Sequence, residues 1–528
     1  MESRNSGEFK LKKIGLLALL AAAGFVMFAN ELPPQREISI CAPLHSYDMN
    51  PYTAAFTAEA QLFTGLYEGL FSYDPADLSP LPAVCSSYKI SRNKKRWTFV
   101  IRENAKFSDG SPITAFDVKD SWITLLSVPD APFASLLDSI TGAAAFRQGK
   151  GAAEDVRIEA RDKATLVVHL DEPLGHFPKI LCHHAFSIMS KKENVYSGAF
   201  VLESKSSDEI VLKKNDFYWD AGSVKIPGVK IQLSDDYAEN AFLFNTGKFD
   251  WVMGNAEAEK IIEKSKVQVG AEFGTLYLFF KNGNYPWNKK EFRDALLEAV
   301  PYDRLRENFN VKAETFIYPL PGYPGVTGIA DYDQADAIKM MNETKQANGI
   351  PLEETLVLVF AVTNDGYVKR LADILKEAWL PLGVDLQIQT TVSDRYNASI
   401  PSWNADLFYY SWIGDFADPL AFLELFRGNS SLNVAGFKDE RFDNLLLEAA
   451  RQDNVSERYR LMAKAEQLLL DESVVIPVSH PISAHLIDLC EIGGWQVNGL
   501  DLHPLKYLYI KSLPSSNVPN LVRYNWQD

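Results

Sequence analysis

Short strand-like runs alternate with amphipathic helical stretches along most of the chain, and this alternation limits the possible folds more than any single motif does. Residues 97–102 (WTFVIR) and 165–170 (TLVVHL) have strand character, and residues 384–389 (VDLQIQ) alternate apolar and polar side chains as a half-buried strand does. Residues 367–379 place an apolar stripe on one face of a helix that Pro381 would end. No internal repeat or long flexible linker is visible. The sequence therefore predicts a mixed α/β chain whose lobes, two or more, are joined by crossing strands.

Capping residues predict where two of the helices begin. Thr114 is followed three residues later by Asp117, which is the spacing of a capping box. Ser456 is the candidate cap of a helix that runs through Leu470. Beyond the last predicted element, residues 513–528 contain two prolines and are expected to form an extended tail.

Composition excludes some classes of protein. The 528 residues carry 53 basic and 69 acidic side chains, a formal net charge of −16, whereas a nucleic-acid binder needs a basic surface. Hydrophobic residues make up 47% of the chain, as in an ordinary globular protein, and the acidic balance suits a soluble monomer. Aromatic residues make up 12%, and such side chains either fill a large core or line a ligand cleft.

The N-terminus has the pattern of an export signal. Basic residues are concentrated in residues 1–13, and an apolar run from Ile14 to Ala29 follows. This run is 16 residues long, shorter than the ~20 that a membrane-spanning helix needs. Residues 21–23 (AAA) and the region of Ala29 are both candidate cleavage sites, and an uncleaved anchor is the alternative. The first cysteine, Cys41, lies too far downstream for lipid attachment, so we expect a periplasmic protein that is not a lipoprotein.

The four cysteines, Cys41, Cys85, Cys182 and Cys490, allow three disulfide pairings between which the sequence does not choose. An oxidising compartment would permit disulfides, but a chain of this length does not need them. The spacing of the four residues resembles no zinc motif, and no cofactor is expected.

Chemistry-bearing motifs are scarce. The G-x-S-x-G, H-E-x-x-H and G-x-G-x-x-G signatures are absent from the sequence, so catalysis is not expected. His176, Cys182, His183 and His184 lie within nine residues, and imidazole and thiolate are good metal ligands. Adjacent histidines on a strand would point to opposite faces, however, and no carboxylates accompany them. A packed pair at the surface is the favoured interpretation, and no metal site is predicted.

Several segments, in order along the chain, resemble one protein family. They are residues 62–71 (LFTGLYEGLF), 97–122 with KFSDGSPITAFDV at 106–118, 197–219 with SGAF at its start, 287–304, and 411–423 with SWIGDFADP at its start. Each segment alone is a weak signal, but their order is specific. From about residue 37 to 512 the chain resembles the family 5 extracellular solute-binding proteins, the oligopeptide- and dipeptide-binding components of ABC importers.

The resemblance implies an α/β fold of the periplasmic-binding-protein type II-like class, with two hinged lobes and an extra α/β domain inserted in the first lobe. Closure of such lobes around a ligand is a known hinge motion. The implied division is a signal peptide or anchor at 1–30, lobe I at 31–67, 191–274 and 486–512, the extra domain at 68–190, lobe II at 275–485 and the tail at 513–528.

The resemblance also implies a ligand site. Asp415 would pair with the α-ammonium group of a peptide, which every unblocked peptide carries whatever its side chains. The backbones of Ser411 and Ile413 would pair with the peptide as an added strand. Side chains that would line the cleft are Thr57, Tyr277 and Trp412, and Trp403 and Tyr409 would suit stacking on a flat ligand.

The sequence departs from this family's pattern at the far end of the site. Long-peptide binders place basic residues just before the ligand motif, whereas residues 400–410 (IPSWNADLFYY) contain no Arg, Lys or His. The predicted function is capture of short peptides for delivery to permease subunits in the inner membrane, without catalysis. The alternatives are the same fold with a sugar, an opine or a nickel chelate as ligand, or a surface role in adhesion or chaperoning.

Overall fold

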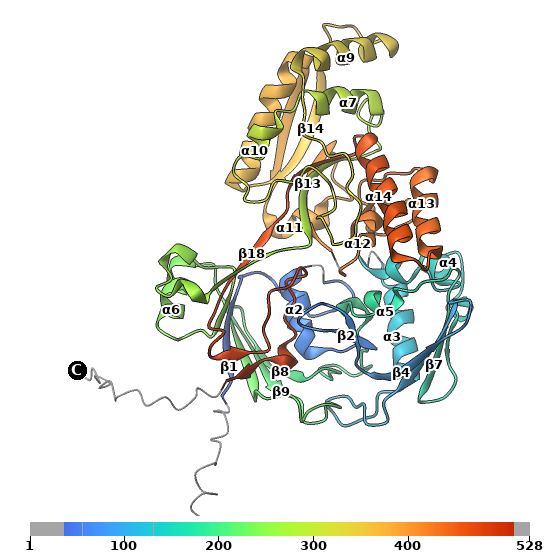
Figure 1. The fold of residues 1–528 in the computed structure, drawn as a ribbon, viewed down its shortest axis with the longest axis vertical. Helices are drawn as coiled ribbons and strands as arrows, with labels where there is room; N and C mark the ends of the chain where they lie inside the picture. Colours follow the sequence, from blue (N-terminus) through green and yellow to red (C-terminus); the bar gives the residue numbers. More distant parts are fainter. Residues whose placement is uncertain (1–35, 55, 130, 415, 512–528) are drawn as a thin grey trace, which may run out of the picture.

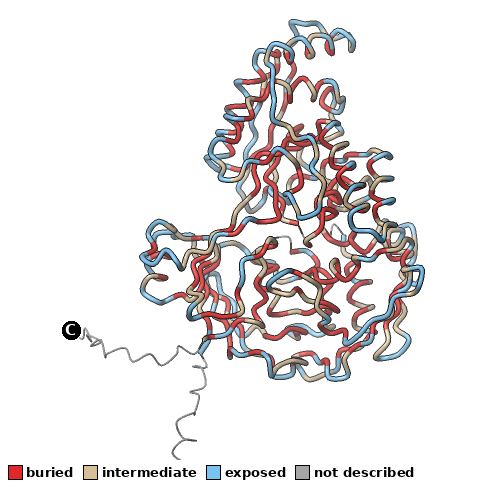
Figure 2. The backbone as a smooth tube through the Cα atoms, in the orientation of Figure 1, coloured by how far each residue is buried: buried red, intermediate tan, exposed pale blue. Residues whose placement is uncertain are grey.

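The computed structural model of the chain describes residues 36–511, with the exception of residues 55, 130 and 415. Its strands form three large sheets, one in each of three units, and two short two-stranded sheets (Figure 1). A buried core runs through each unit, and exposed residues lie on the outer helices and loops (Figure 2). The predicted α/β fold with two lobes and an inserted domain is confirmed. Asp415, the predicted ligand carboxylate, lies outside the described residues.

Lobe I is built on a seven-stranded sheet with the order β12-β18-β11-β1-β10-β9-β8. The central strand β1 pairs in parallel with β10 and β11, and its Ile38 and Ile40 are each 1% exposed. This burial is expected because central parallel strands are covered on both faces. The elements of lobe I are β1 (Ile38–Ala42), α2 (Thr57–Leu66), β8 (Phe200–Lys205), β9 (Glu209–Lys214), β10 (Gly228–Leu233), α6 (Tyr237–Asn245), β11 (Trp251–Met253), β12 (Val267–Ala271) and β18 (Ile482–Ile487).

The extra domain lies between α2 and β8 in the chain and contains a four-stranded antiparallel sheet with the order β4-β5-β7-β6. The predicted capping box is confirmed, since the Asp117 carboxylate accepts from the backbone N–H of Thr114 at 2.8 Å and from its hydroxyl at 2.6 Å. The helix that it opens buries Trp122 completely. The elements are β2 (Phe71–Tyr73), β3 (Pro80–Pro82), β4 (Cys85–Ile90), β5 (Arg96–Ile101), α3 (Ala115–Ser127), α4 (Ala143–Arg147), β6 (Ile158–Ala160), β7 (Thr165–His169) and α5 (Phe177–Ile180).

Lobe II is built on a five-stranded sheet with the order β15-β14-β16-β13-β17. The predicted cap Ser456 is wrong by two residues: the Asn454 side chain accepts from the backbone N–H groups of Ser456 and Glu457. The elements are β13 (Gly274–Phe280), α7 (Lys290–Glu298), α8 (Tyr302–Leu305), α9 (Gln334–Ala347), β14 (Leu356–Thr363), α10 (Gly366–Trp379), β15 (Val384–Thr391), α11 (Ser393–Ser399), β16 (Leu407–Ile413), α12 (Leu420–Leu423), α13 (Glu440–Arg451), α14 (Val455–Asp471) and β17 (Val475–Ser479).

Two adjacent chain crossings connect the lobes, as the sequence predicted. The chain passes from β12 in lobe I to β13 in lobe II, and returns from β17 to β18 (Figure 1). The crossings contact each other, because the Glu272 N–H donates to the Pro481 carbonyl at 3.1 Å. After β18 the described part of the chain returns to lobe I, where it forms β19 (Ile492–Gly493) and β20 (Tyr509–Ile510).

The extra domain also contacts lobe II, on the side away from the crossings. Arg451 on α13 forms an ion pair with Glu172 at 2.9 Å, and the Arg147 guanidinium on α4 donates to the Asn429 carbonyl at 3.0 Å. The Ser431 hydroxyl donates to the Pro132 carbonyl at 3.1 Å. Lobe I with its extra domain and lobe II are therefore in contact on two sides of the region between them.

The remaining expectations concern cysteines and the membrane. All four cysteines are free thiols, with Cys490 exposed and the other three buried, so none of the three possible pairings is formed. In the part of the chain that the structure describes, no helix is both long enough and apolar enough to cross a membrane.

Candidate functional site

A cavity of about 270 Å³ lies where the three units meet. Lobe I contributes one side of α2, Tyr67 and residues 500, 502 and 504. The extra domain contributes residues 68, 69, 71–73, 133, 182–184 and 187, and lobe II contributes Asn397 on α11 and residues 410–414 at the end of β16. The residues that line it include Thr57, Phe63, Thr64, Tyr67, Glu68, Tyr73, Phe133, Cys182, His183, His184, Asn397, Tyr410, Ser411, Trp412, Ile413, Leu500 and Leu502.

The end of β16 presents main-chain groups that the sheet does not use. β13 pairs antiparallel with all of β16, and Gly414 donates its N–H to the Phe273 carbonyl at 2.8 Å, so the even-numbered residues of β16 bond to β13. The N–H and C=O groups of Ser411 and Ile413 point to the other side, where β14 pairs only as far as Phe408. Within the described part of the chain, no strand pairs with Ser411 and Ile413 on that side.

Trp412 is held firmly beside this edge. Its side chain is 8% exposed, its indole N–H donates to the Ala421 carbonyl at 3.1 Å, and its ring stacks on Tyr410 with a centroid distance of 6.1 Å. It also approaches Phe133 of the extra domain at 6.3 Å. Trp412 therefore forms a rigid aromatic wall that two units share.

The structure brings some of the predicted site residues together and leaves others apart. Ser411, Trp412, Ile413 and Thr57 all line the cavity. Tyr277 is 2% exposed and packs edge-on against Phe316 at 4.9 Å, because β13 is an inner strand of its sheet, between β16 and β17, and is buried along its whole length.

Tyr409 and Trp403 lie outside the lining of the cavity. The hydroxyl groups of Tyr409 and Tyr367 form a hydrogen bond. The Trp403 ring packs on Tyr396 with a centroid distance of 5.9 Å, and its indole N–H donates to the Gln389 side chain at 2.6 Å. Along a strand, alternate residues face opposite sides, so Tyr409 turns away from the face that holds Tyr410 and Trp412.

His183 and His184, which the sequence analysis interpreted as a packed pair at the surface, line the cavity instead. His183 is only 6% exposed, and a short 3₁₀ turn over residues 184–186, rather than a strand, places the two rings 4.1 Å apart on the same side. The surface placement was therefore wrong. Burial lowers the pKa of His183 to about 3 and holds the pKa of His184 well below its usual value, so both imidazoles are neutral.

The tautomers of these histidines follow from their backbone contacts. The Nδ1 atom of His183 accepts from the Ala185 N–H at 3.2 Å, so its Nε2 carries the proton. The Nε2 atom of His184 lies 3.4 Å from the Ala54 carbonyl oxygen and donates to it, which leaves Nδ1 as an acceptor. The wall from the extra domain is therefore polar and uncharged.

Comparison with known proteins identifies the family. The sequence model of the bacterial extracellular solute-binding proteins, family 5, matches residues 79–433. The chain belongs to this family. It is 28% identical to the dipeptide-binding protein DppE of Bacillus subtilis, in an alignment that covers 82% of this chain and 84% of DppE. It is 27% identical to the periplasmic oligopeptide-binding protein OppA of Salmonella typhimurium, in an alignment that covers 88% of this chain and 90% of OppA. Among solved structures, the murein tripeptide-binding protein MppA of Escherichia coli superposes with a TM-score of 0.80 at 23% identity, covering 91% of this chain and 100% of that one.

Two acids in the family-like segments have structural partners in the described chain. Glu68 lines the cavity, but it accepts from Lys506 at 2.6 Å, from the Tyr218 hydroxyl at 2.6 Å and from the Trp219 indole at 2.5 Å, so its charge is compensated. No Lys or Arg is among the described residues that line the cavity.

Asp418, in the SWIGDFADP segment, is 1% exposed and forms two bonds of 2.6 and 2.7 Å with Arg458. Burial alone would raise the pKa of Asp418, but the Arg458 charge outweighs this effect and lowers it. Asp418 therefore anchors the loop after β16 to α14.

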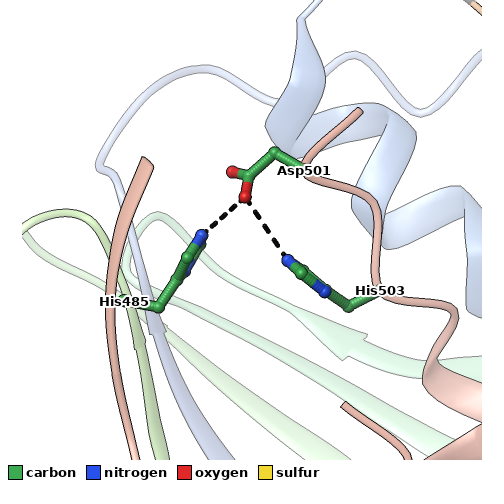
Figure 3. Close-up of side chains that lie close together, drawn as sticks. All are labelled: His485, Asp501 and His503. Carbon is green, nitrogen blue, oxygen red and sulfur yellow. Dashed lines mark hydrogen bonds and ion pairs between the residues drawn. The ribbon is translucent and has the colours of Figure 1, made fainter. Parts of the chain in front are cut away.

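A second cluster of potential metal ligands lies in lobe I, where His485 and His503 both contact one carboxylate oxygen of Asp501, at 2.7 and 3.4 Å (Figure 3). The Nδ1 atom of His485 accepts from the Trp251 indole N–H at 3.1 Å, so Nε2 carries the proton that it donates to Asp501. A metal-bound histidine normally donates its second ring N–H instead. The cluster is therefore suited to a hydrogen-bond network that ties the C-terminal segment to β18.

Proposed function

We propose that this chain is the substrate-binding component of an ABC importer, which captures a short peptide between its two lobes and delivers it to permease subunits in the inner membrane. The observation that carries the proposal is the unpaired edge of β16 at Ser411 and Ile413, which borders the cavity. An added strand pairs with main-chain groups alone, so it gains affinity without reading side chains. The relatives named for dipeptide and oligopeptide binding support the same ligand class.

We propose that Asp415 binds the amino end of the ligand. Asp415 follows Gly414 in the sequence, directly after the unpaired edge. A carboxylate in a closed cleft makes a strong charge-assisted bond to an ammonium group. Thr57 and Trp412 line the same cavity, and we propose that they contact the ligand. We propose that Tyr277, Tyr409 and Trp403 do not contact the ligand directly but pack behind and beyond Trp412 and so support the wall that lobe II contributes.

The domain division proposed for this function follows the predicted boundaries. Lobe I comprises residues 31–67, 191–274 and 486–512, the extra domain 68–190 and lobe II 275–485. The leader at 1–30 exports the protein to the periplasm, where it acts as a monomer without a catalytic role, and residues 513–528 form the tail. Movement about the two chain crossings opens and closes the cavity.

A non-peptide ligand is the second candidate. The observation that favours a non-peptide ligand is the absence of Lys and Arg from the described cavity lining. A peptide ends in a carboxylate, for which a cationic side chain would be the usual partner. A neutral aromatic and imidazole wall would also accept a flat or sugar-like molecule.

Native mass spectrometry of the protein purified without denaturation separates the two candidates. A ladder of masses that match short peptides is the expected result. One discrete mass that corresponds to a sugar or a chelate would overturn the peptide assignment, and a stably empty protein that binds no peptide from a random library would overturn it as well.

A further inference from the structure

The unpaired edge of β16 is short, and its length limits how much of a peptide it can hold. The backbone N–H of Tyr409 lies on the same side as those of Ser411 and Ile413, but it already donates to the Tyr396 hydroxyl at 3.0 Å. The same hydroxyl donates to the Ala361 carbonyl at 2.8 Å on β14. Regular pairing with a ligand is therefore available at Ser411 and Ile413, and it stops at Tyr409.

The direction of the ligand follows from the proposed function, on which this inference rests. If the ammonium group lies near Asp415, the peptide runs from that end of β16 back toward Tyr409, antiparallel to β16. Paired residues in an antiparallel ladder alternate, so Ile413 pairs with the first residue of the peptide and Ser411 with the third. A fifth residue would reach Tyr409, whose N–H is occupied.

Helix α11 closes the site at this point. Tyr396 is 2% exposed, and its two hydrogen bonds fix the helix in the fork between β14 and β16. The next residue, Asn397, is exposed and lines the cavity. The Asn397 carboxamide has no hydrogen bond to another described residue, so its donor and acceptor groups are available to a ligand.

The size of the cavity agrees with a short ligand. Its volume of about 270 Å³ lies just below the ~300–1,000 Å³ that is usual for ligand pockets. An extended peptide of three residues spans about 10 Å, whereas the four steps along β16 from Ile413 to Tyr409 span about 13–14 Å, so the third residue ends about one residue short of the fork.

We propose that the site is built for tripeptides and that Asn397 meets the C-terminal carboxylate of the third residue, in place of a cation. The Asn397 N–H₂ group donates to the carboxylate as a neutral partner. Asn397 thus determines the length of peptide that the protein prefers. It holds the C-terminal end of the ligand, where the sequence lacks the basic residues of long-peptide binders.

The test measures affinities for three synthetic libraries: random tripeptides, the same tripeptides with amidated C-termini, and random pentapeptides. In the wild type, pentapeptides should bind no more than twofold tighter than tripeptides. In Asn397→Asp, the free-acid tripeptides should bind at least tenfold more weakly than in the wild type, because two carboxylates then face each other, whereas the amidated tripeptides should change less than threefold.

Ala398→Asp is the matched control, since it adds the same charge one residue further along α11, at an exposed position outside the cavity lining. It should change each affinity less than twofold. Pentapeptides that bind tenfold tighter than tripeptides, or an Asn397→Asp effect that is equal for free-acid and amidated peptides, would overturn the inference while leaving the peptide function intact. Failure of all three libraries to bind the wild type would instead overturn the proposed function.

Discussion

The two walls of the cavity differ in what they offer a ligand. The wall from lobe II ends in the unpaired main chain of Ser411 and Ile413, which is the same for every side chain that could stand there. The opposite wall, from α2 and the extra domain, consists of side chains, among them the neutral His183 and His184. On the proposed function, we expect the first wall to supply affinity for any short peptide and the second to discriminate between peptides.

The largest expected effect concerns Asp415, which follows Ile413 and Gly414 in the sequence. Asp415→Ala should weaken the binding of tripeptides by about 2–5 kcal/mol, because the α-ammonium group would be buried without its partner. Isothermal titration calorimetry with a tripeptide and with its N-acetylated form measures the loss. The wild type should discriminate strongly against the acetylated form, and the variant should not. Equal binding of both forms to the wild type would contradict the role of Asp415.

A smaller effect is expected from removing one main-chain donor. Ile413→Pro deletes the N–H that faces the cavity and leaves the bonds between β16 and β13 in place, since those belong to even-numbered residues. One lost hydrogen bond of about 1–1.5 kcal/mol corresponds to roughly a tenfold weaker affinity for all tripeptides alike. Ser411→Ala is the matched control, because it removes only a side chain and should bind as the wild type does. A loss in Ile413→Pro that depends on the peptide's side chains would blur the distinction between the walls.

Substitution in the side-chain wall should alter selectivity more than average affinity. His184 lines the cavity, and His184→Phe removes its Nδ1 acceptor but keeps an aromatic ring of similar size. Peptides with a donor in the matching side chain should lose a few-fold in affinity, whereas trialanine should change less than twofold. A competition experiment with a peptide library, read by mass spectrometry, measures the change. A uniform loss across the library would indicate that this wall also supplies general affinity.

The smallest expected effect is the pH dependence of that wall. Burial depresses the pKa of both histidines, that of His183 to about 3, so neither takes up a proton as the pH falls from 7 to 5. The ratio of tripeptide affinities between the wild type and His184→Gln should therefore be constant over this range, as measured by calorimetry at several pH values. A ratio that changes below pH 6.5 would show that the imidazole becomes charged in the cavity.

The same depressed pKa values should make the folding stability depend on pH, although the binding does not. The unfolded chain binds protons at these histidines below about pH 6.5 and the folded chain does not, so their contribution to stability is complete above that pH and is lost as the pH falls. We therefore expect peptide affinity to stay constant over a pH range in which the free energy of unfolding decreases.

The sequence predicted the fold and the main-chain wall better than the side-chain wall. The alternation of strands and helices predicted a mixed α/β chain because it records local periodicity. The two lobes with an inserted domain were implied by the resemblance of the family-like segments. Thr57, Ser411, Trp412 and Ile413 line one cavity. Three of them are consecutive, so a single strand positions them.

The missed residues come from segments whose approach depends on tertiary packing. Phe133, His183, His184 and Asn397 lie in three stretches far apart in the chain, and no spacing in the sequence brings them together. The signal that could have pointed to the histidines was their adjacency, but they were assumed to lie on a strand, whereas a 3₁₀ turn places both rings on one side. Tyr277 is an aromatic residue of the kind that lines clefts, and its burial depends on its place in an inner strand of the sheet.

Hydrogen exchange at single amides tests the central claim most directly. In the free protein, the amides of Trp412 and Gly414 should be protected by β13 and that of Tyr409 by Tyr396, while those of Ser411 and Ile413 should exchange quickly. On saturation with a tripeptide, the account predicts that Ser411 and Ile413 become protected by at least tenfold and that Tyr409 changes little. Unchanged exchange at Ser411 and Ile413 in a protein shown to be saturated would contradict capture of the peptide as an added strand.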